Sequence, residues 1–111
     1  MAATSVKLIV YPVTDIEKAK TFYNQFLGTE PYVDTPYYVG YRMDNLEIGL
    51  DPNSESGPIA YTDVEDINVS LKELSEAGGD IVQGVKNVGN GLLIAQAKDS
   101  KGNIVGLRQQ S

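Results

Sequence analysis

The sequence predicts an α+β fold made of two β-α-β-β-β modules. Three observations carry this prediction: residues 13–16 (VTDI) recur as residues 64–67 (VEDI), a strand pattern precedes and a helix pattern follows each copy, and a polar segment separates the two halves. A general preference of strand-to-helix junctions for such residues would explain the four letters alone. The matching order of elements around both copies favours a duplication.

The first module begins with a strand and a helix. Residues 6–13 (VKLIVYPV) are β-branched and aromatic, which predicts a strand buried on both faces. Thr14, with Glu17 three positions on, has the form of a capping box, so we expect a helix over 15–27 with Thr14 as its N-cap and Gly28 at its C-terminal cap. Its apolar stripe, at spacings of three and four, consists of Ile16, Ala19, Phe22, Tyr23, Phe26 and Leu27.

The remaining elements are short strands and one more helix. Alternating patterns and turn residues place the further strands of the first module at 32–33, 37–43 and 46–50, and those of the second at 59–64, 81–88, 92–98 and 103–108. A helix over 66–77 carries Ile67, Leu71 and Leu74 on one face. We expect one domain over 1–111, with modules at about 5–51 and 58–109 and a linker at about 52–57.

Composition restricts the chemistry. The chain has no cysteine and no histidine, which excludes disulfides, thiolate catalysis and the commonest ligand of zinc, iron and copper. Nine Lys and Arg against 15 Asp and Glu give a net charge of −6, which disfavours nucleic acid and membrane partners. This acidity serves either solubility or the attraction of a cationic ligand. No membrane-span pattern or signal peptide is recognised, so we expect a cytoplasmic protein.

Two motifs resemble those of one superfamily. Residues 11–23 (YPVTDIEKAKTFY), followed by Leu27 and Gly28, are similar to a V-x-D-hydrophobic-E-x-A-x-x-FY opening, and residues 99–107 (DSKGNIVGL) resemble a D-P-D-G-N-x-x-E-L ending. The chain thus resembles, over nearly its whole length, a domain of the vicinal oxygen chelate superfamily of glyoxalases, bleomycin resistance proteins and extradiol dioxygenases. The resemblance implies curved mixed sheets that form a cup around the ligand, with the helices outside, and in many members a cup shared across a dimer.

The resemblance also implies where a metal would bind. Metal-dependent members of the glyoxalase type place one ligand on the first strand and one on the last strand of each module. Carried over to this chain, the first-strand positions are Leu8 and Ile59, and the last-strand positions are Glu47 and Gly106. Since one carboxylate does not hold a divalent transition metal, we expect no metal and no other cofactor.

Strand alternation extends these positions to a predicted cup lining, because residues two apart share a face. The tyrosines at 32, 37, 38 and 41 provide either a stacking surface for a planar or cationic ligand or packing at the core or a dimer interface. No catalytic residue is assigned. The predicted ligand-binding residues are Leu8, Val10, Tyr38, Glu47, Ile59, Tyr61, Ile104, Gly106 and Arg108.

The missing ligands favour a metal-free homodimer that sequesters or senses a small organic molecule of cationic or aromatic character, as in the bleomycin resistance branch. The alternative is a lyase, isomerase or dioxygenase of the same superfamily, against which Leu8, Ile59 and Gly106 argue. A third interpretation is a structural or regulatory module whose cup is filled by its own side chains.

Overall fold

The computed structural model of the protein describes residues 3–54 and 57–110, and these form two compact units. The N-terminal unit comprises residues 7–59, and the C-terminal unit comprises residues 60–110 together with residues 3–6. Residues 55 and 56 of the expected linker lie outside the described part of the chain. Neither helix in the described part is long and apolar enough to cross a membrane.

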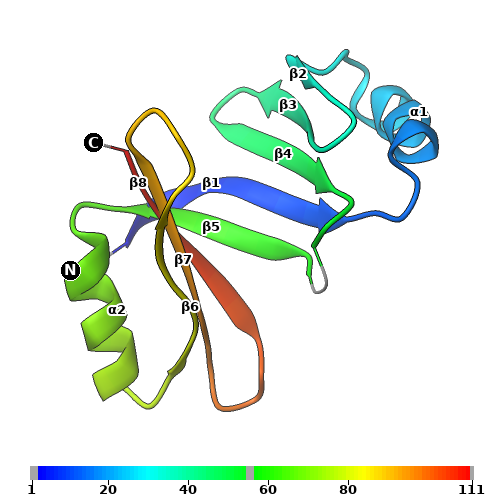
Figure 1. The fold of residues 1–111 in the computed structure, drawn as a ribbon. Helices are drawn as coiled ribbons and strands as arrows, with labels where there is room; N and C mark the ends of the chain where they lie inside the picture. Colours follow the sequence, from blue (N-terminus) through cyan, green and yellow to red (C-terminus); the bar gives the residue numbers. More distant parts are fainter. Residues whose placement is uncertain (1–2, 55–56, 111) are drawn as a thin grey trace. The chain divides into compact units, whose positions relative to one another are not determined.

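The N-terminal unit has its last strand beside its first. Strands β1 and β4 run parallel, and β3 pairs antiparallel with both β4 and β2, which gives the order β2-β3-β4-β1 (Figure 1). The elements are β1 (Ala3–Pro12), α1 (Ile16–Leu27), β2 (Val33–Asp34), β3 (Val39–Met43) and β4 (Leu46–Asp51).

The C-terminal unit repeats this topology. Strands β5 and β8 run parallel, and β7 pairs antiparallel with β8 and β6, which gives the order β5-β8-β7-β6. The elements are β5 (Ile59–Val64), α2 (Ile67–Glu76), β6 (Asp80–Asn87), β7 (Leu92–Lys98) and β8 (Ile104–Gln110). The predicted α+β fold of two β-α-β-β-β modules is therefore confirmed.

Helix α1 is capped one residue later than predicted. Asp15 has the extended backbone of an N-cap, and its carboxylate accepts the N–H of Lys18 at 3.1 Å, so the assignment of Thr14 as N-cap was wrong. Both residue types suit the cap, but a carboxylate is also favoured by the positive end of the helix dipole. At the other end Gly28 adopts the left-handed conformation, with φ of 70°, as predicted.

The apolar stripe of α1 is narrower than the sequence indicates. Ile16, Ala19, Tyr23 and Leu27 pack against the core that β3 and β4 provide. Phe22 and Phe26 lie on the flank of this stripe, stack on each other at 6.3 Å between ring centroids, and are 63% and 71% exposed. The core of this unit consists of Val39, Tyr41, Ile48 and Leu50.

The C-terminal unit follows its prediction more closely. Ile67, Leu71 and Leu74 of α2 face the strands as expected, and Asp66 caps the helix by accepting the N–H groups of Asn68 and Val69. On the strands, the buried partners of this helix are Val64, Ala95, Ala97 and Leu107. At the start of β1, however, Val6 is exposed, so the first strand is not buried on both faces along its whole length.

The cap assignment yields a direct test. Asp15→Ala removes the acceptor for the N–H of Lys18 and should lower the free energy of unfolding by about 1 kcal/mol. Thr14→Ala should change it by less than about 0.5 kcal/mol, as for an ordinary surface residue. Urea denaturation followed by circular dichroism measures both. A larger loss of unfolding free energy for Thr14→Ala than for Asp15→Ala would support Thr14 as the N-cap instead.

Candidate functional site

The strands of the N-terminal unit present one face to α1 and the other away from it. Because Ile9 and Tyr11 of β1 and Ile48 and Leu50 of β4 pack toward the helix, their neighbours along each strand point to the opposite side. This surface is called here the N-terminal face. It consists of Leu8, Val10, Gly40, Arg42, Glu47 and Gly49, with Tyr32 and Tyr38 placed on it from the segments before β2 and β3.

Tyr38 lies on the N-terminal face because the chain turns before β3. The hydroxyl of Thr35 accepts the N–H groups of Tyr37 and Tyr38, so these residues are not part of the strand that was predicted over 37–43. The Tyr38 ring packs onto Gly49: a Cβ atom added there would lie 2.7 Å from Cζ of Tyr38 and 2.9 Å from Cε1. The glycine at this position is therefore what makes room for the tyrosine.

Tyr32, Arg42 and Glu47 form a polar group on the same face. The Tyr32 hydroxyl donates a hydrogen bond to Oε1 of Glu47, and the guanidinium carbon of Arg42 lies 4.2 Å from the centroid of the Tyr32 ring. Arg42 and Glu47 are direct partners in the β3–β4 register. Burial, with the Glu47 carboxylate as a further cause, raises the pKa of Tyr32 and keeps its hydroxyl a donor.

The C-terminal unit has an equivalent face, called here the C-terminal face, which points away from α2. On it, Nε of Arg108 donates to Oδ1 of Asp63 at 2.8 Å, and the side-chain amide of Gln96 donates to the Tyr61 hydroxyl, also at 2.8 Å. A carboxylate and an arginine therefore lie together on this face, as they do on the N-terminal face. The residues of the face are Tyr61, Asp63, Ile94, Gln96, Ile104, Gly106 and Arg108.

The Tyr61 ring fills the space above Gly106. A Cβ atom added at Gly106 would lie 2.6 Å from Cε1 of Tyr61 and 2.7 Å from Cγ, closer than real side chains approach each other. Tyr61 is only 6% exposed, so its ring is held in place by its surroundings. Gly106 is the position where the family resemblance leads us to expect a metal-binding glutamate, and the Tyr61 ring leaves no room for such a side chain.

The residues at the expected ligand positions do not fit a divalent metal. Leu8, Ile59 and Gly106 supply no donor atom, and Glu47 already accepts the Tyr32 hydroxyl. In the β5–β8 register Gly106 is opposite Tyr61, not Ile59, so the two expected ligand positions of the second module are not partners. Within residues 3–54 and 57–110, no three Asp or Glu side chains gather closely enough to hold a metal ion.

The structure distributes the predicted cup lining over the two faces. Leu8, Val10, Tyr38 and Glu47 lie on the N-terminal face, and Leu8 and Glu47 are partners across β1 and β4. Tyr61, Ile104, Gly106 and Arg108 lie on the C-terminal face, while Ile59 is buried at the start of β5.

The predicted tyrosine cluster is not one surface. Tyr41 is fully buried beneath α1, where its hydroxyl donates to Oδ1 of Asn24 at 2.6 Å, and burial raises its pKa. Tyr37 is 73% exposed. Only Tyr32 and Tyr38 lie on the N-terminal face, because strand alternation sends Tyr41 to the opposite side of the sheet.

Sequence reasoning missed Arg42 and Gln96. A signal existed for Arg42: a two-residue turn at Asp44 and Asn45 fixes the hairpin register and places Arg42 opposite Glu47. For Gln96 the sequence offers no comparable signal, because its contact with Tyr61 depends on a ring that spans the intervening strand β8.

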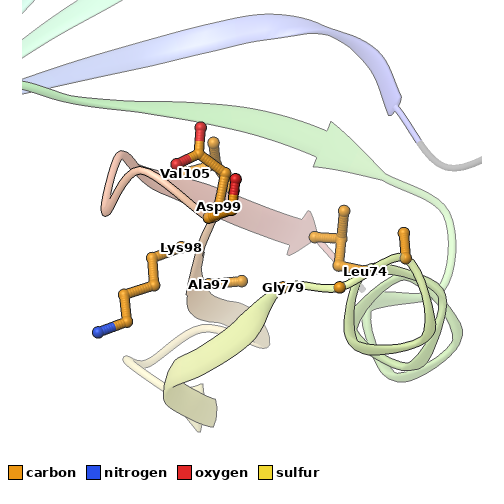
Figure 2. Close-up of a pocket in the computed structure, with 9 residues that line it drawn as sticks. Leu74, Gly79, Ala97, Lys98, Asp99 and Val105 are labelled. Atoms are coloured by element: carbon orange, nitrogen blue, oxygen red, sulfur yellow. The ribbon is translucent and has the colours of Figure 1, made fainter.

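A separate pocket of about 370 Å³ lies on the helix side of the C-terminal unit (Figure 2). Its walls are largely apolar, and Figure 2 shows the Lys98 side chain extending away from Leu74. The Asp99 carboxylate is engaged in its own turn, where it accepts the side-chain amide of Asn103 at 3.0 Å. None of the predicted site residues lines this pocket. Its lining is Leu74, Ala77, Gly78, Gly79, Ala97, Lys98, Asp99, Ser100 and Val105.

Comparison with known families and proteins gives one match by sequence. Residues 5–107 match the family described as Glyoxalase/Bleomycin resistance protein/Dioxygenase superfamily. No protein of curated function matches the chain significantly.

Solved structures with low sequence identity share the fold. A glyoxalase/bleomycin resistance protein/dioxygenase superfamily member from Vibrio splendidus 12B01 is 16% identical, with a TM-score of 0.75 over 97% of this chain and 100% of its own. A methylmalonyl-CoA epimerase variant from Streptomyces coelicolor, in complex with 2-nitronate-propionyl-CoA, is 14% identical, with a TM-score of 0.74 over 98% and 99%. The Mn(II)-bound glyoxalase from Novosphingobium aromaticivorans is 13% identical, with a TM-score of 0.77 over 98% of this chain and 40% of its own.

The contact between Tyr61 and Gly106 can be tested by substitution. Gly106→Ala forces a methyl group against the ring and should lower the free energy of unfolding by about 1–3 kcal/mol. Gly84→Ala is the control, because a Cβ atom there meets nothing within 4 Å and the backbone angle is ordinary. In the Tyr61→Ala background, Gly106→Ala should cost much less. An equal cost in both backgrounds, measured by urea denaturation, would disprove the contact.

The turn beside the pocket should respond to acid. Hydrogen bonds from Asn103 lower the pKa of Asp99 below its ordinary value of 3.8. A lowered pKa in the folded state means that the stabilisation is present above pH 3.8 and is lost as the pH falls through the folded value. Asp99→Asn should therefore lower the urea midpoint at neutral pH, and the difference from the wild type should shrink in acid. A difference between Asp99→Asn and the wild type that stays the same in acid would contradict this interpretation of the turn.

Proposed function

Because this chain belongs to the Glyoxalase/Bleomycin resistance protein/Dioxygenase superfamily, we propose that it is a metal-free homodimer that binds a small organic molecule. The contact of Tyr61 with Gly106 carries the proposal, because the Tyr61 ring occupies the space that a metal-binding side chain at position 106 would need. The lack of side-chain donors at Leu8, Ile59 and Gly106 argues against metal-dependent catalysis at this site and supports a binding role. Its biological role is then the sequestration or the sensing of that molecule.

The composition of the two faces supports a ligand site. Leu8 and Val10 give the N-terminal face an apolar floor, and Tyr32 and Tyr38 add aromatic rings with polar ends. Few, well-placed polar groups on an apolar surface are typical of small-molecule pockets. On the C-terminal face, Gln96 and the Asp63–Arg108 pair provide the corresponding polar groups. We place the ligand on the N-terminal face, on Leu8, Tyr32 and Tyr38.

The dimer is supported by exposed apolar side chains. Phe22 and Phe26 on α1 are more than half exposed, and Ile81, Val82 and Val88 on and after β6 are close to half exposed. Clusters of exposed apolar side chains mark interaction surfaces in soluble proteins. Pairing of two chains is the form of association that the superfamily resemblance implies.

An enzyme of the lyase, isomerase or dioxygenase type is the second candidate. One observation favours it: the Tyr32 hydroxyl and the Glu47 carboxylate are hydrogen-bonded, and such a pair is able to move a proton to or from a bound molecule. A reaction of this kind would be acid–base catalysis by these two side chains. Consumption of the ligand would identify it.

A ligand screen in the presence of a chelator tests the proposal. Uncharged and cationic aromatic compounds are screened by thermal shift, because a ligand that binds the native state raises its melting temperature. We expect a compound that binds at about one molecule per chain and is recovered unchanged. Leu8→Gln should weaken binding, whereas Lys72→Met on α2 should not. A screen without any stabilising compound would contradict the proposal, and conversion of the compound would favour the enzyme.

A further inference from the structure

The N-terminal face contains the parts of a cation site. An aromatic ring and a carboxylate, Tyr32 and Glu47, are joined by a hydrogen bond. Ring faces and carboxylates are the two groups that attract organic cations most directly. A ligand cation would take a place over the ring and beside the carboxylate.

That place is taken by a cation of the protein itself. The guanidinium carbon of Arg42 lies 4.2 Å from the centroid of the Tyr32 ring, within the range of a cation–π contact. The β3–β4 register also puts Arg42 directly across from Glu47. Both groups that would attract a ligand cation therefore already have partners within the chain: the Tyr32 ring contacts Arg42, and the Glu47 carboxylate accepts the Tyr32 hydroxyl.

On the C-terminal face, too, a carboxylate is paired with an arginine. Its carboxylate, Asp63, accepts the Arg108 Nε at 2.8 Å, and the Arg108 side chain is only 15% exposed. The two carboxylates named on the faces are therefore each accompanied by an arginine. The net charge of −6 derives from residues elsewhere, such as the exposed Glu17 of α1 and Glu73 of α2.

We infer that Arg42 occupies the cation position of the N-terminal face, and that the ligand of the proposed function is an uncharged aromatic molecule. This inference rests on the proposed function, because it names the ligand class of that site. It replaces the expectation of a cationic ligand that the acidity of the chain suggests. An uncharged ring packs on Leu8 and Tyr38 and leaves Arg42 in place, whereas a cation must first displace Arg42.

Three probes of equal shape and different charge test this inference. Benzamide is uncharged, benzamidine is a cation whose planar amidinium resembles the guanidinium of Arg42, and benzoate is an anion. Dissociation constants are measured by calorimetry for the wild type and for Arg42→Met. We expect the wild type to bind benzamide more tightly than benzamidine or benzoate. Arg42→Met should bind benzamidine roughly tenfold more tightly than the wild type does, with benzamide little changed.

Matched variants separate this effect from a change in net charge. Lys72→Met removes one exposed positive charge elsewhere, and Arg42→Lys keeps a cation over the ring, so neither should gain benzamidine affinity. Adding Glu47→Gln to Arg42→Met should remove the gain. Benzamidine binding to the wild type as tightly as benzamide, or no gain in Arg42→Met, would overturn the inference and leave the proposed function standing. Failure of all three probes to bind either protein would count against both.

Discussion

The ring of Tyr61 packs on Gly106, a strand position without a side chain, and the arrangement of polar groups on the C-terminal face depends on this contact. Gly106 lets the ring cross strand β8 and reach Gln96 on β7. In the N-terminal unit, Gly49 accommodates Tyr38 in the same manner. In each unit, a glycine in a strand therefore leaves the space that a tyrosine ring occupies. Interiors pack too densely for a longer side chain to share that space.

This packing decides what the faces are able to bind. A carboxylate at position 106 would require the Tyr61 ring to leave, and the aliphatic side chains of Leu8 and Ile59 offer no replacement donors. The polar groups that remain are already arranged in pairs, Tyr32 with Glu47 and Arg108 with Asp63. In the proposed function, both pairs would orient a ligand through hydrogen bonds and shape, and the charges of Arg108 and Asp63 compensate each other.

Much of the fold was predictable from the sequence because it depends on local patterns. Strands β5 and β7 begin and end where alternation and turn residues place them, and Ile67, Leu71 and Leu74 form the buried stripe of α2. The start of helix α1 was harder to predict, because Thr14 and Asp15 are both good N-cap residues and only the folded backbone decides between them. Likewise, spacing alone does not separate a core aromatic residue from a flanking one such as Phe22.

The candidate site was predictable only in part. Alternation correctly groups Leu8 with Val10, and Gly106 with Arg108, because residues two apart on a strand share a face. The contacts that give these positions their chemistry join residues far apart in the sequence. The Arg108 pair with Asp63 spans 45 positions and the Gln96 contact with Tyr61 spans 35, and both depend on strand pairing that forms only in the folded chain.

Metal binding by the purified protein tests the central claim most directly. The metal content of freshly prepared protein is determined, and melting temperatures are measured with added Zn, Ni, Mn and Fe salts, since ligation of the native state must raise its stability. If Tyr61 and Gly106 have closed the metal position, the protein carries no stoichiometric metal and no salt shifts its melting temperature. About one metal ion per chain, with a clear rise in melting temperature, would contradict this account.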